Sequence, residues 1–596
     1  MGLRGAGEIS RRRLIQLGAM GALAAVGTSY GPRSPAAVAA AGRGLFAAGA
    51  AGRGPLAAGA AEPPKADWAR LATQLLGRLS LPGSPGYPLD LQIYNPVFDS
   101  THPAAIAFCA NANDVARCIT FARDHRLPIA ARSGGHSYAG YSTTTGLVID
   151  VSLMSRLTMA AGASKTGWIA TVGAGARLID VYSGLEQQGF SIPAGSCPTV
   201  GIAGLALGGG IGVMDRLWGL TSDNIVGLEI VTAAGEIVRA DAANNADLYW
   251  ACRGGGGGNF GIVTEFRFSA FPLTATALFF ATWPWEAARQ LLPAWLEWAP
   301  AGPDELWSNC ILGADPGAAH PYIRVGGVWA GSEASAQAQL NRLIAMAGPP
   351  SSQVVGQNAF EDAMYIEADC GGLSETECHL SGRYPGGTLP RAITVAKSDI
   401  LNEPLSDAGV EAVLAGIERR QPEGGPGGVV LDSWGGAINR VAPGATAFVH
   451  RKALASAQYA AILSEGAHPE AIEGARNWMS NWYATLRPYM SGEAYQNYID
   501  PALPNWEKAY YGANLARLRQ VKGKWDPGDV FHFAQSIPLP AAKSEQVRIS
   551  GTPTSWGSRE EREASQLGHD HHRRKQDHRQ GVHPGAVHQG KPRRGR

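Results

Sequence analysis

The pattern of hydrophobic and polar residues first identifies a region of short apolar runs separated by glycine-rich turns, from about residue 104 to 273. This pattern predicts short strands mixed with helices, which together indicate an α+β fold. We expect a helix over Asn113–His125, with Asn111 or Asn113 as its N-cap, and a second over Ala176–Gln188. The expected strands are Ile106–Cys109, Leu147–Val151, Ile169–Val172 and Leu228–Val231.

The pattern changes after residue 273, and we interpret residues 67–273 and 274–495 as two domains. The second region carries longer strand-like runs and helical stretches of its own. Residues 496–540 are richer in aromatic side chains and form a separate segment. The second region's expected strands are Ala277–Thr282, Tyr322–Trp329 and Gly428–Trp434, and its expected helices are Ala287–Trp298 and Ser332–Met346.

Both ends of the chain have a different texture. Ser10–Gln16 contains paired arginines and is followed by a weakly apolar stretch and a small-residue site, Ala36–Ala40. This order predicts a twin-arginine-type signal peptide over residues 1–40, and hence a secreted or extracytoplasmic protein. A chance basic N-terminus is the alternative. Residues 41–66 form an Ala/Gly-rich linker that contains a duplicated decapeptide, and residues 541–596 form a tail that we expect to be disordered.

Composition narrows the class of protein. The chain has 596 residues, of which 45% are hydrophobic and 17% charged, with a net charge of +1, so neither nucleic acid nor a membrane surface is indicated as a partner. No run of ~20 apolar residues predicts a transmembrane helix. The seven cysteines show no CxxC pair and no zinc-type spacing, so no metal is expected; Cys370 and Cys378 are close enough for a local disulfide.

The first candidate motif is a Gly-Gly-His loop over Ala131–Tyr141, which follows a strand-like run. Successive backbone N–H groups in such a loop can surround a pyrophosphate, because glycine lacks the Cβ that would block its approach. His136 lies inside the loop and would reach whatever the loop binds. An ordinary turn with a hydrogen-bonded histidine is the alternative interpretation.

The second motif extends from Pro193 to Gly212 and contains seven glycines between positions 195 and 212. This glycine content makes a stable regular helix unfavourable and suits a backbone that lies against a flat aromatic ligand. Cys197 lies among small residues rather than the bulky apolar neighbours of a buried structural thiol. A loop that packs small residues together is the alternative.

The third motif combines Gly219–Val226 with Arg253–Val263, which includes five consecutive glycines. A nicotinamide-binding Rossmann fingerprint is not indicated, because no GxGxxG opens a helix after a strand with an acidic residue about 20 positions later. No Walker A pattern is present either.

Together these motifs resemble the berberine bridge enzyme-like branch of the vanillyl-alcohol oxidase superfamily of FAD-linked oxidases. The resemblance covers residues 67–540 and includes a C-terminal pattern, Tyr510–Asn514 followed by Gln535–Pro538. It implies a two-subdomain PCMH-type FAD-binding domain over 67–273 and an α+β substrate domain with a central antiparallel sheet over 274–495. Segment 496–540 would return to complete the FAD site.

The family resemblance also implies how FAD would be held. Members can bind FAD twice, through a histidine at the flavin 8α carbon and a cysteine at C6, and both residues are present here as His136 and Cys197. The full set of expected FAD-binding residues is His136, Cys197, Arg132, Ser133, Gly134, Gly135, Ser137, Gly140, Tyr141, Pro198, Thr199, Val200, Gly201, Gly204, Gly208, Gly209, Gly210, Gly212, Asp223, Asn259, Gly261, Val263 and Asn514.

The resemblance suggests Tyr510, with Tyr511 beside it, as the catalytic base that accepts the proton of a substrate hydroxyl while hydride passes to flavin N5. Aromatic packing is the alternative for this pair. Asp432, Trp434 and Asn439 are weaker candidates for the substrate face. Val200, three residues after Cys197, resembles the oxygen-accessible members, which favours an oxidase that produces hydrogen peroxide.

Three functions follow from the sequence. The favoured one is a secreted oxidase of a small-molecule alcohol, with a sugar or oligosaccharide anomeric hydroxyl as the preferred target and O2 as acceptor. A tailoring oxidase of a secondary metabolite is the second. A flavin-binding protein without turnover is the third, and the presence of His136, Cys197 and Tyr510 argues against it.

Overall fold

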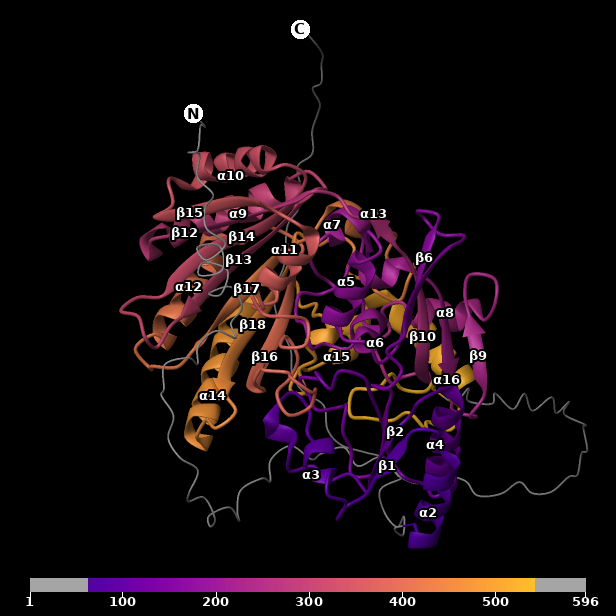
Figure 1. Ribbon diagram of the computed structural model, residues 1–596. Coiled ribbons are helices and arrows are strands. Elements are labelled where there is room, and N and C mark those ends of the chain that lie inside the picture. Colours follow the sequence, from indigo (N-terminus) through magenta and orange to yellow (C-terminus); the bar gives the residue numbers. More distant parts are fainter. Residues whose placement is uncertain (1–62, 542–596) are drawn as a thin grey trace, which may run out of the picture. The chain divides into compact units, whose positions relative to one another are not determined.

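The computed structural model describes residues 63–541, and these contain three multi-stranded sheets and one two-stranded ribbon (Figure 1). The predicted signal peptide, most of the predicted linker and nearly all of the predicted tail lie outside the described residues. None of the helices within residues 63–541 has the length and apolar character needed to cross a membrane.

The first sheet has the strand order β1-β2-β4-β3 and is mostly parallel. Strands β2 and β4 are buried along their whole length, as expected for a sheet that is covered on both faces. Helix α4 begins where the Asn111 side chain accepts a hydrogen bond from the backbone N–H of Asp114, so Asn111 is the N-cap. The elements of this part are α2 (Lys65–Gln74), β1 (Arg78–Ser80), α3 (Tyr87–Asp90), β2 (Ala105–Phe108), α4 (Ala112–Asp124), β3 (Ile129–Arg132) and β4 (Leu147–Asp150).

The second sheet is antiparallel, with the order β5-β6-β10-β8-β9. A two-stranded ribbon, β7 with β11, lies beside it in the chain. The elements are β5 (Leu157–Ala161), β6 (Trp168–Gly173), α5 (Leu178–Glu186), β7 (Phe190–Ser191), β8 (Ile225–Val231), β9 (Ile237–Ala240), α8 (Ala246–Ala251), β10 (Ile262–Ser269) and β11 (Phe271–Pro272).

The glycine-rich segment from 195 to 212 departs from the expectation that it would lack regular helix. Residues Ile202–Leu207 form the short helix α6, and Asp215–Trp218 form α7. Helix α6 contains one glycine, Gly204, and its other five positions are Ile, Ala and Leu, which are enough for a turn and a half. The glycines that break the helix come after it, because Gly209 and Gly210 have φ values of +125° and +82°.

The third sheet has seven antiparallel strands in the order β15-β12-β14-β13-β17-β18-β16. Helices cover one of its faces, because Trp295 in α9 donates a hydrogen bond to Ser308 in β13 and Trp482 in α14 packs on Tyr459 in β18. The strands are β12 (Thr276–Trp283), β13 (Leu306–Ala314), β14 (Tyr322–Ala330), β15 (Ser352–Asn358), β16 (Ala392–Leu401), β17 (Gly427–Ser433) and β18 (Ala455–Ser464). The helices are α9 (Ala288–Ala301), α10 (Glu333–Ala347), α11 (Phe360–Glu367), α12 (Asp407–Arg420), α13 (Gly436–Arg440) and α14 (Pro469–Leu486).

The C-terminal segment returns to the glycine-rich motifs, as the family resemblance implied. Lys522 is fully buried, and its ammonium donates to Asp526 at 2.7 Å and to the carbonyl of Asn259 at 3.0 Å. The Asn259 side chain in turn accepts from the backbone N–H of Ile537 at 2.8 Å. This segment contains α15 (Trp506–Tyr511) and α16 (Leu515–Trp525). Short 3-10 turns elsewhere are η1 (Pro96–Phe98), η2 (Thr221–Asn224), η3 (Trp285–Ala287), η4 (Arg487–Tyr489), η5 (Gln496–Tyr498) and η6 (Gly512–Asn514).

Cys370 and Cys378 form a disulfide, with their Cα atoms 5.9 Å apart, so the pairing that the sequence left open is present. Among the free cysteines of the described residues, Cys197 is the exposed one. The other free cysteines, Cys109, Cys118, Cys252 and Cys310, are buried.

Candidate active site

The Gly-Gly-His loop starts where strand β3 ends, and its backbone is available to an anion. The N–H groups of residues 134–139 donate no hydrogen bond to another group within the described part of the chain. Gly135 and Gly140 hold φ values near +75°, which turn the chain tightly. A row of uncommitted N–H groups in a glycine turn is an anion nest of the kind that binds phosphate groups.

This loop is in close backbone contact with the second motif. A Cβ placed on Gly134 would lie 2.2 Å from the backbone N of Gly201, and one on Gly201 would lie 2.1 Å from Ser133 Oγ. Both positions therefore require glycine, because any larger residue would push the two loops apart. The sequence placed both glycines at the cofactor; the structure shows that they also join the two predicted loops.

His136 is held on two sides. Its Nε2 lies 2.9 Å from the hydroxyl of Thr199, and its ring stacks on Tyr94 with the centroids 4.1 Å apart. Burial first, and then the positive charges of Arg177 and Arg383, lower the pKa of His136 to about 3. The imidazole is therefore neutral at physiological pH.

Cys197 is two residues from Thr199, so the Thr199–His136 contact brings the two predicted linkage residues into one site. The cysteine is solvent-accessible, yet it lies deep enough in the protein that burial raises the pKa of its thiol, with a further contribution from the carboxylate of Asp432. A thiol that is both accessible and deep borders a cleft. The charge of Cys197 also acts on four tyrosines around it, which are Tyr94, Tyr138, Tyr182 and Tyr498.

One face of the seven-stranded sheet carries polar side chains and contacts the Gly-Gly-His loop through Gln458. Trp295 and Tyr459 identify the face that the helices cover, and alternation along the strands places the next residues on the opposite face. Gln458 lies on that opposite face and donates to the hydroxyl of Tyr138 in the Gly-Gly-His loop at 2.6 Å. The strand register aligns Gln458 and its same-face neighbours across β14, β13, β17 and β18, and these neighbours are Arg324, Asn309, Asp432 and Ser456.

Asp432 has the environment of a proton acceptor. It lies on this face of β17, and burial raises its pKa to about 7. Its charge acts on both Cys197 and Tyr498, and the Tyr498 ring stacks on Tyr138 at 5.9 Å. A carboxyl group whose pKa is near neutrality can exchange protons efficiently at physiological pH.

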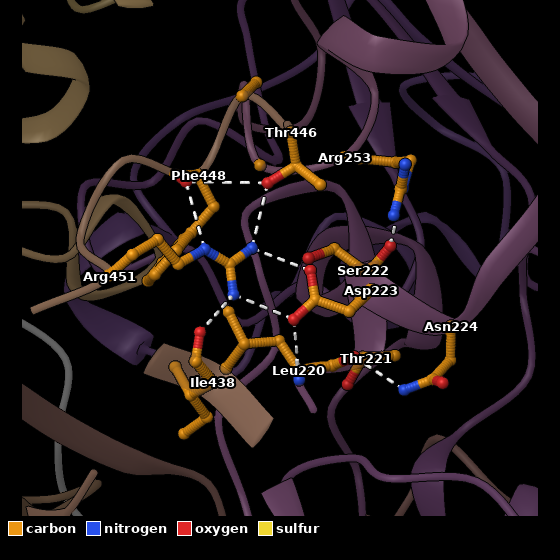
Figure 2. A network of polar contacts seen from close by, with 12 residues as sticks. Leu220, Thr221, Ser222, Asp223, Asn224, Arg253, Ile438, Thr446, Phe448 and Arg451 are labelled. Carbon is orange, nitrogen blue, oxygen red and sulfur yellow. Dashed lines mark hydrogen bonds and ion pairs between the residues drawn. The ribbon is translucent and has the colours of Figure 1, made fainter. Parts of the chain in front are cut away.

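Several predicted cofactor residues make hydrogen bonds or ion pairs within the protein. Arg132 is buried and pairs with Asp150 at 2.6 Å, so it anchors strand β3. Asp223 uses both carboxylate oxygens to accept from Arg451, at 2.7 and 2.8 Å (Figure 2). The cofactor contact of Asp223 stays a prediction, and within the protein its carboxylate accepts from Arg451 and from the backbone N–H of Leu220.

Some of the predicted cofactor-binding glycines border open space, and others contact protein atoms. A Cβ on Gly204 would meet nothing within 4 Å, so helix α6 leaves open space at this position. The later glycines of the motif approach protein atoms rather than open space: a Cβ would meet Asn497 at Gly208, Phe448 at Gly209, Thr221 at Gly210 and the Ala194 carbonyl at Gly212. Gly261 similarly faces the Val231 carbonyl, and Val263 is a buried residue of β10.

The remaining predicted residues act mainly as anchors. Ser133 donates to the Ala174 carbonyl at 2.7 Å, and Ser137 accepts from the N–H of Tyr141 at 3.1 Å. The Asn514 amide donates to three carbonyls of residues 443–447, which fits the loop-anchor role that the sequence suggested. Pro198 is buried, and Val200 is partly exposed beside Cys197.

Tyr510 and Tyr511 are almost fully buried, and the Tyr510 hydroxyl accepts from the backbone N–H of Asp500 at 2.9 Å. Burial raises the pKa of both tyrosines, and Cys197 is not among the groups that act on them. Trp434 is fully buried against Phe448, and Asn439 donates to the Ala453 carbonyl, so neither lies on the polar sheet face. The role of Tyr510 as a base stays a prediction, while Asp432, Tyr498 and Gln458 are the residues that the structure groups around Cys197.

The sequence analysis did not identify Gln458 and Tyr498, and it gave Asp432 as a weaker candidate for the substrate face. The sequence did contain one sign that Asp432 is functional, which is an acidic residue in the mostly apolar run Gly427–Ser433. A carboxylate is rarely buried in a strand unless it is paired or has a function. Tyr498 lies in the sequence Tyr-Gln-Asn-Tyr-Ile-Asp, which precedes the C-terminal pattern that begins at Tyr510. No hydrophobic period or motif spacing marks Tyr498 as a functional residue.

The residues present fit a flavin dinucleotide. The free N–H row of the Gly-Gly-His loop suits a pyrophosphate, and the open position at Gly204 leaves room near it. The neutral His136 and the accessible Cys197 are the two nucleophiles of the cleft. Tyrosine rings and a polar sheet face surround them.

Comparisons with known proteins agree with this fit. The FAD binding domain family model matches residues 103–241, and the berberine and berberine-like model matches residues 494–538. The FAD-linked oxidoreductase YgaK of Bacillus subtilis (strain 168) is 34% identical over 474 residues, which cover 78% of this chain and 98% of that protein.

Two solved structures are also similar. BBE-like 1 of Physcomitrella patens is 31% identical with a TM-score of 0.70, covering 80% of this chain and 99% of that one. A chitooligosaccharide oxidase is 27% identical with a TM-score of 0.70, covering 80% and 100%. From the two matching domains, the similarity to YgaK over nearly its whole length and the shared PCMH-type fold, we conclude that this chain belongs to the berberine bridge enzyme-like FAD-linked oxidoreductases.

Proposed function

We propose that the protein is an oxidase that holds FAD through two covalent bonds, from His136 and Cys197, and oxidises an alcohol group of a small molecule. The observation that carries the proposal is the 2.9 Å hydrogen bond between the Thr199 hydroxyl and His136 Nε2, which joins the two nucleophile-bearing loops in one cleft. FAD, when bound, would accept a hydride at N5 and pass both electrons to O2, giving H2O2. Two covalent bonds would hold the ring without protein above it, leaving the cleft open to substrate.

In this proposal Asp432 accepts the proton of the substrate hydroxyl, in place of the Tyr510 that the sequence suggested. Its pKa of about 7 makes the carboxylate available near neutrality, whereas burial raises the pKa of Tyr498 well above its ordinary value. Tyr498 would instead donate a hydrogen bond to the substrate oxygen, beside Tyr138. Gln458 would hold the Tyr138 hydroxyl in place.

A sugar or oligosaccharide is the favoured substrate, with oxidation at the anomeric hydroxyl. Asp432 and Gln458 are partly exposed on one sheet face, with the buried Arg324 and Asn309 beside them on the same face, and exposed polar groups of this kind can hydrogen-bond a ligand with many hydroxyl groups. The similarity to a chitooligosaccharide oxidase supports the same class. The alternative is a tailoring oxidase of a secondary metabolite, for which the surrounding tyrosines would supply the apolar contacts.

Oxygen as acceptor rests on Val200, whose small side chain beside Cys197 resembles the oxygen-accessible members of the family. Replacing it with leucine should slow reoxidation of the reduced enzyme by O2 while leaving anaerobic reduction by substrate unchanged. A stopped-flow experiment separates the two half-reactions. Equal reoxidation rates for the wild type and Val200→Leu would contradict the proposal that Val200 controls the access of O2.

We also propose that the protein is exported through its twin-arginine-type leader. The Cys370–Cys378 disulfide supports an oxidising compartment, since such bonds are rare in the cytosol. The mature chain should be detected outside the cytoplasm. The triple variant Arg11→Lys, Arg12→Lys and Arg13→Lys should instead be retained inside the cytoplasm, and export of this variant at the wild-type level would contradict the proposal.

The deciding experiment is the visible spectrum before and after acid precipitation. Yellow colour should stay with the pellet in the wild type, in His136→Ala and in Cys197→Ala, and be lost only in the double variant. Release of the yellow colour from the wild type would refute covalent attachment.

A panel of sugars and hydrophobic alcohols, measured by peroxide release, then separates the two substrate classes. Failure of every donor to bleach the flavin would indicate a binding protein without turnover.

A further inference from the structure

The histidine of the Gly-Gly-His loop is bound to Thr199. Nε2 contacts the Thr199 hydroxyl at 2.9 Å, and the Thr199 backbone also bonds to the ring, whereas no side chain hydrogen-bonds to Nδ1 within residues 63–541. Tyr94 stacks on the ring and fixes its plane. Thr199 is buried and has no other side-chain hydrogen bond in this part of the chain, so its hydroxyl is committed to His136.

A neutral imidazole carries its single proton on one nitrogen, and the hydrogen bond at the other end selects which. If Nε2 is the protonated nitrogen, it donates to Thr199 and Nδ1 presents a lone pair. If Nδ1 is protonated, Nε2 accepts from Thr199 and Nδ1 has no lone pair with which to form a bond. Only the first arrangement can form a bond to carbon through Nδ1.

We propose that Thr199 is a positioning residue for covalent FAD attachment: it accepts the Nε2 hydrogen of His136, which leaves Nδ1 as the nucleophile for the flavin 8α carbon. This inference rests on the proposed function, because it presupposes the bond from His136. It assigns to Thr199 a contact with the histidine rather than the direct cofactor contact that the sequence suggested.

The attachment balances as an oxidation. A C–H bond of the 8α methyl group breaks, an Nδ1–C8α bond forms, and the imidazole releases its Nε2 proton. The two electrons pass to the flavin ring with two protons, and O2 removes them as H2O2. After the reaction Nε2 has a lone pair, and the Thr199 hydroxyl can rotate and donate to it, so one hydroxyl serves both the reactant and the product.

Charge around the ring favours the same chemistry. Arg177 and Arg383 both act on His136, and together with burial they oppose its protonation. Arg177 donates to the Gly175 carbonyl at 3.0 Å, and Arg383 donates to the Gln92 carbonyl, so both guanidinium groups are anchored. An imidazolium would have no lone pair, and these two residues keep that form rare.

The test uses the full-length Cys197→Ala protein, in which only the histidyl bond can form. Thr199→Val removes the hydroxyl and keeps the shape, and Thr199→Ser keeps the hydroxyl. The freshly purified FAD-containing proteins are incubated in air at pH 7, and acid-stable flavin is followed by in-gel fluorescence and intact mass. Total FAD is measured in parallel by absorbance.

Thr199→Val should bind FAD normally but attach it about 10–100-fold more slowly, as found when the orienting partner of a ligating histidine is lost. Thr199→Ser should attach it at close to the parent rate. Equal rates for the valine and serine variants would overturn the proposal. Loss of FAD binding by the valine variant would also overturn it, because Thr199 would then hold the cofactor or the fold. If the Cys197→Ala parent itself released all its flavin to acid, the proposed function would fail instead.

Discussion

Arg451 donates two hydrogen bonds, of 2.7 and 2.8 Å, to the carboxylate of Asp223, which lies 228 residues earlier in the sequence (Figure 2). Both side chains are almost fully buried. Asp223 lies in the turn η2 that follows the glycine-rich motif, and Arg451 lies just before strand β18 of the seven-stranded sheet. The pair therefore joins the predicted FAD-binding and substrate regions.

Breaking this pair should be costly. Arg451→Met leaves the Asp223 carboxylate buried without its partner, and loss of one member of a buried ion pair typically costs about 3–5 kcal/mol. We expect a clear drop in the thermal melting midpoint, with a smaller drop when Asp223→Leu is added, because the orphaned charge is then removed. The melting midpoint is measured by circular dichroism at pH 7.

The exposed pair Arg289–Glu411 is the matched control, with both side chains about half exposed and Nε–Oε1 at 2.7 Å. Arg289→Met should leave the midpoint nearly unchanged, because surface ion pairs contribute little. If the Arg451 and Arg289 variants melted alike, burial of the Arg451–Asp223 pair would not be the source of its effect.

Asp432 should control both the rate and its pH dependence. The carboxylate must be ionised to accept a proton, so kcat/KM should rise as pH increases through about 7 and then level off. Asp432→Asn should lower kcat by about 100- to 10,000-fold and remove that rise. Steady-state peroxide release between pH 5 and 9 measures both effects.

Asp399 provides the comparison, since burial also raises its pKa to about 7 but Tyr483 and Arg487 contact it away from Cys197. Asp399→Asn should keep the pH profile of the parent. A profile that disappeared in this variant and persisted in Asp432→Asn would exclude Asp432 as the base.

The disulfide should stabilise the loop that follows α11. Closing a loop of this size removes roughly 2–3 kcal/mol of conformational entropy from the unfolded chain in the chain-entropy model. Cys370→Ser with Cys378→Ser should lower the melting midpoint, and adding dithiothreitol should lower the wild type to the same value without affecting the variant. If dithiothreitol left the melting midpoint of the wild type unchanged while the double variant had a lower midpoint, the effect would come from packing of the sulfur atoms and not from the disulfide bond.

The sequence was a good guide where chemistry depends on backbone shape. Gly134, Gly135 and His136 were identifiable because a glycine turn after a strand has few other uses, and the apolar runs located the strands to within a few residues. Asp432 and Tyr498 were harder, because their roles depend on register across β13, β17 and β18 and on a loop that returns from far along the chain. The ion pair of Asp223 could not be predicted for the same reason: its partner is 228 residues away, and nothing near Asp223 signals it.

The two covalent bonds should form in a fixed order with different pH dependence. The pKa of His136 is about 3, so the imidazole is neutral between pH 6 and 9 and its attachment should be insensitive to pH in that range. Cys197 must first lose its proton, and both burial and the Asp432 carboxylate raise the pKa of its thiol. The cysteinyl bond should therefore form second, and faster as pH rises, because the thiolate fraction grows about tenfold per pH unit below the pKa.

Asp432→Asn separates this effect from catalysis. Removing the negative charge lowers the pKa of Cys197, so the variant should form the cysteinyl bond faster than the wild type at pH 7 while turning over more slowly. The measurement is acid-stable flavin in the His136→Ala background, with and without Asp432→Asn, across pH 6 to 9. A cysteinyl rate that did not change with pH in either protein would mean that thiolate formation is not the limiting step, and the order of the two bonds would then depend on geometry alone.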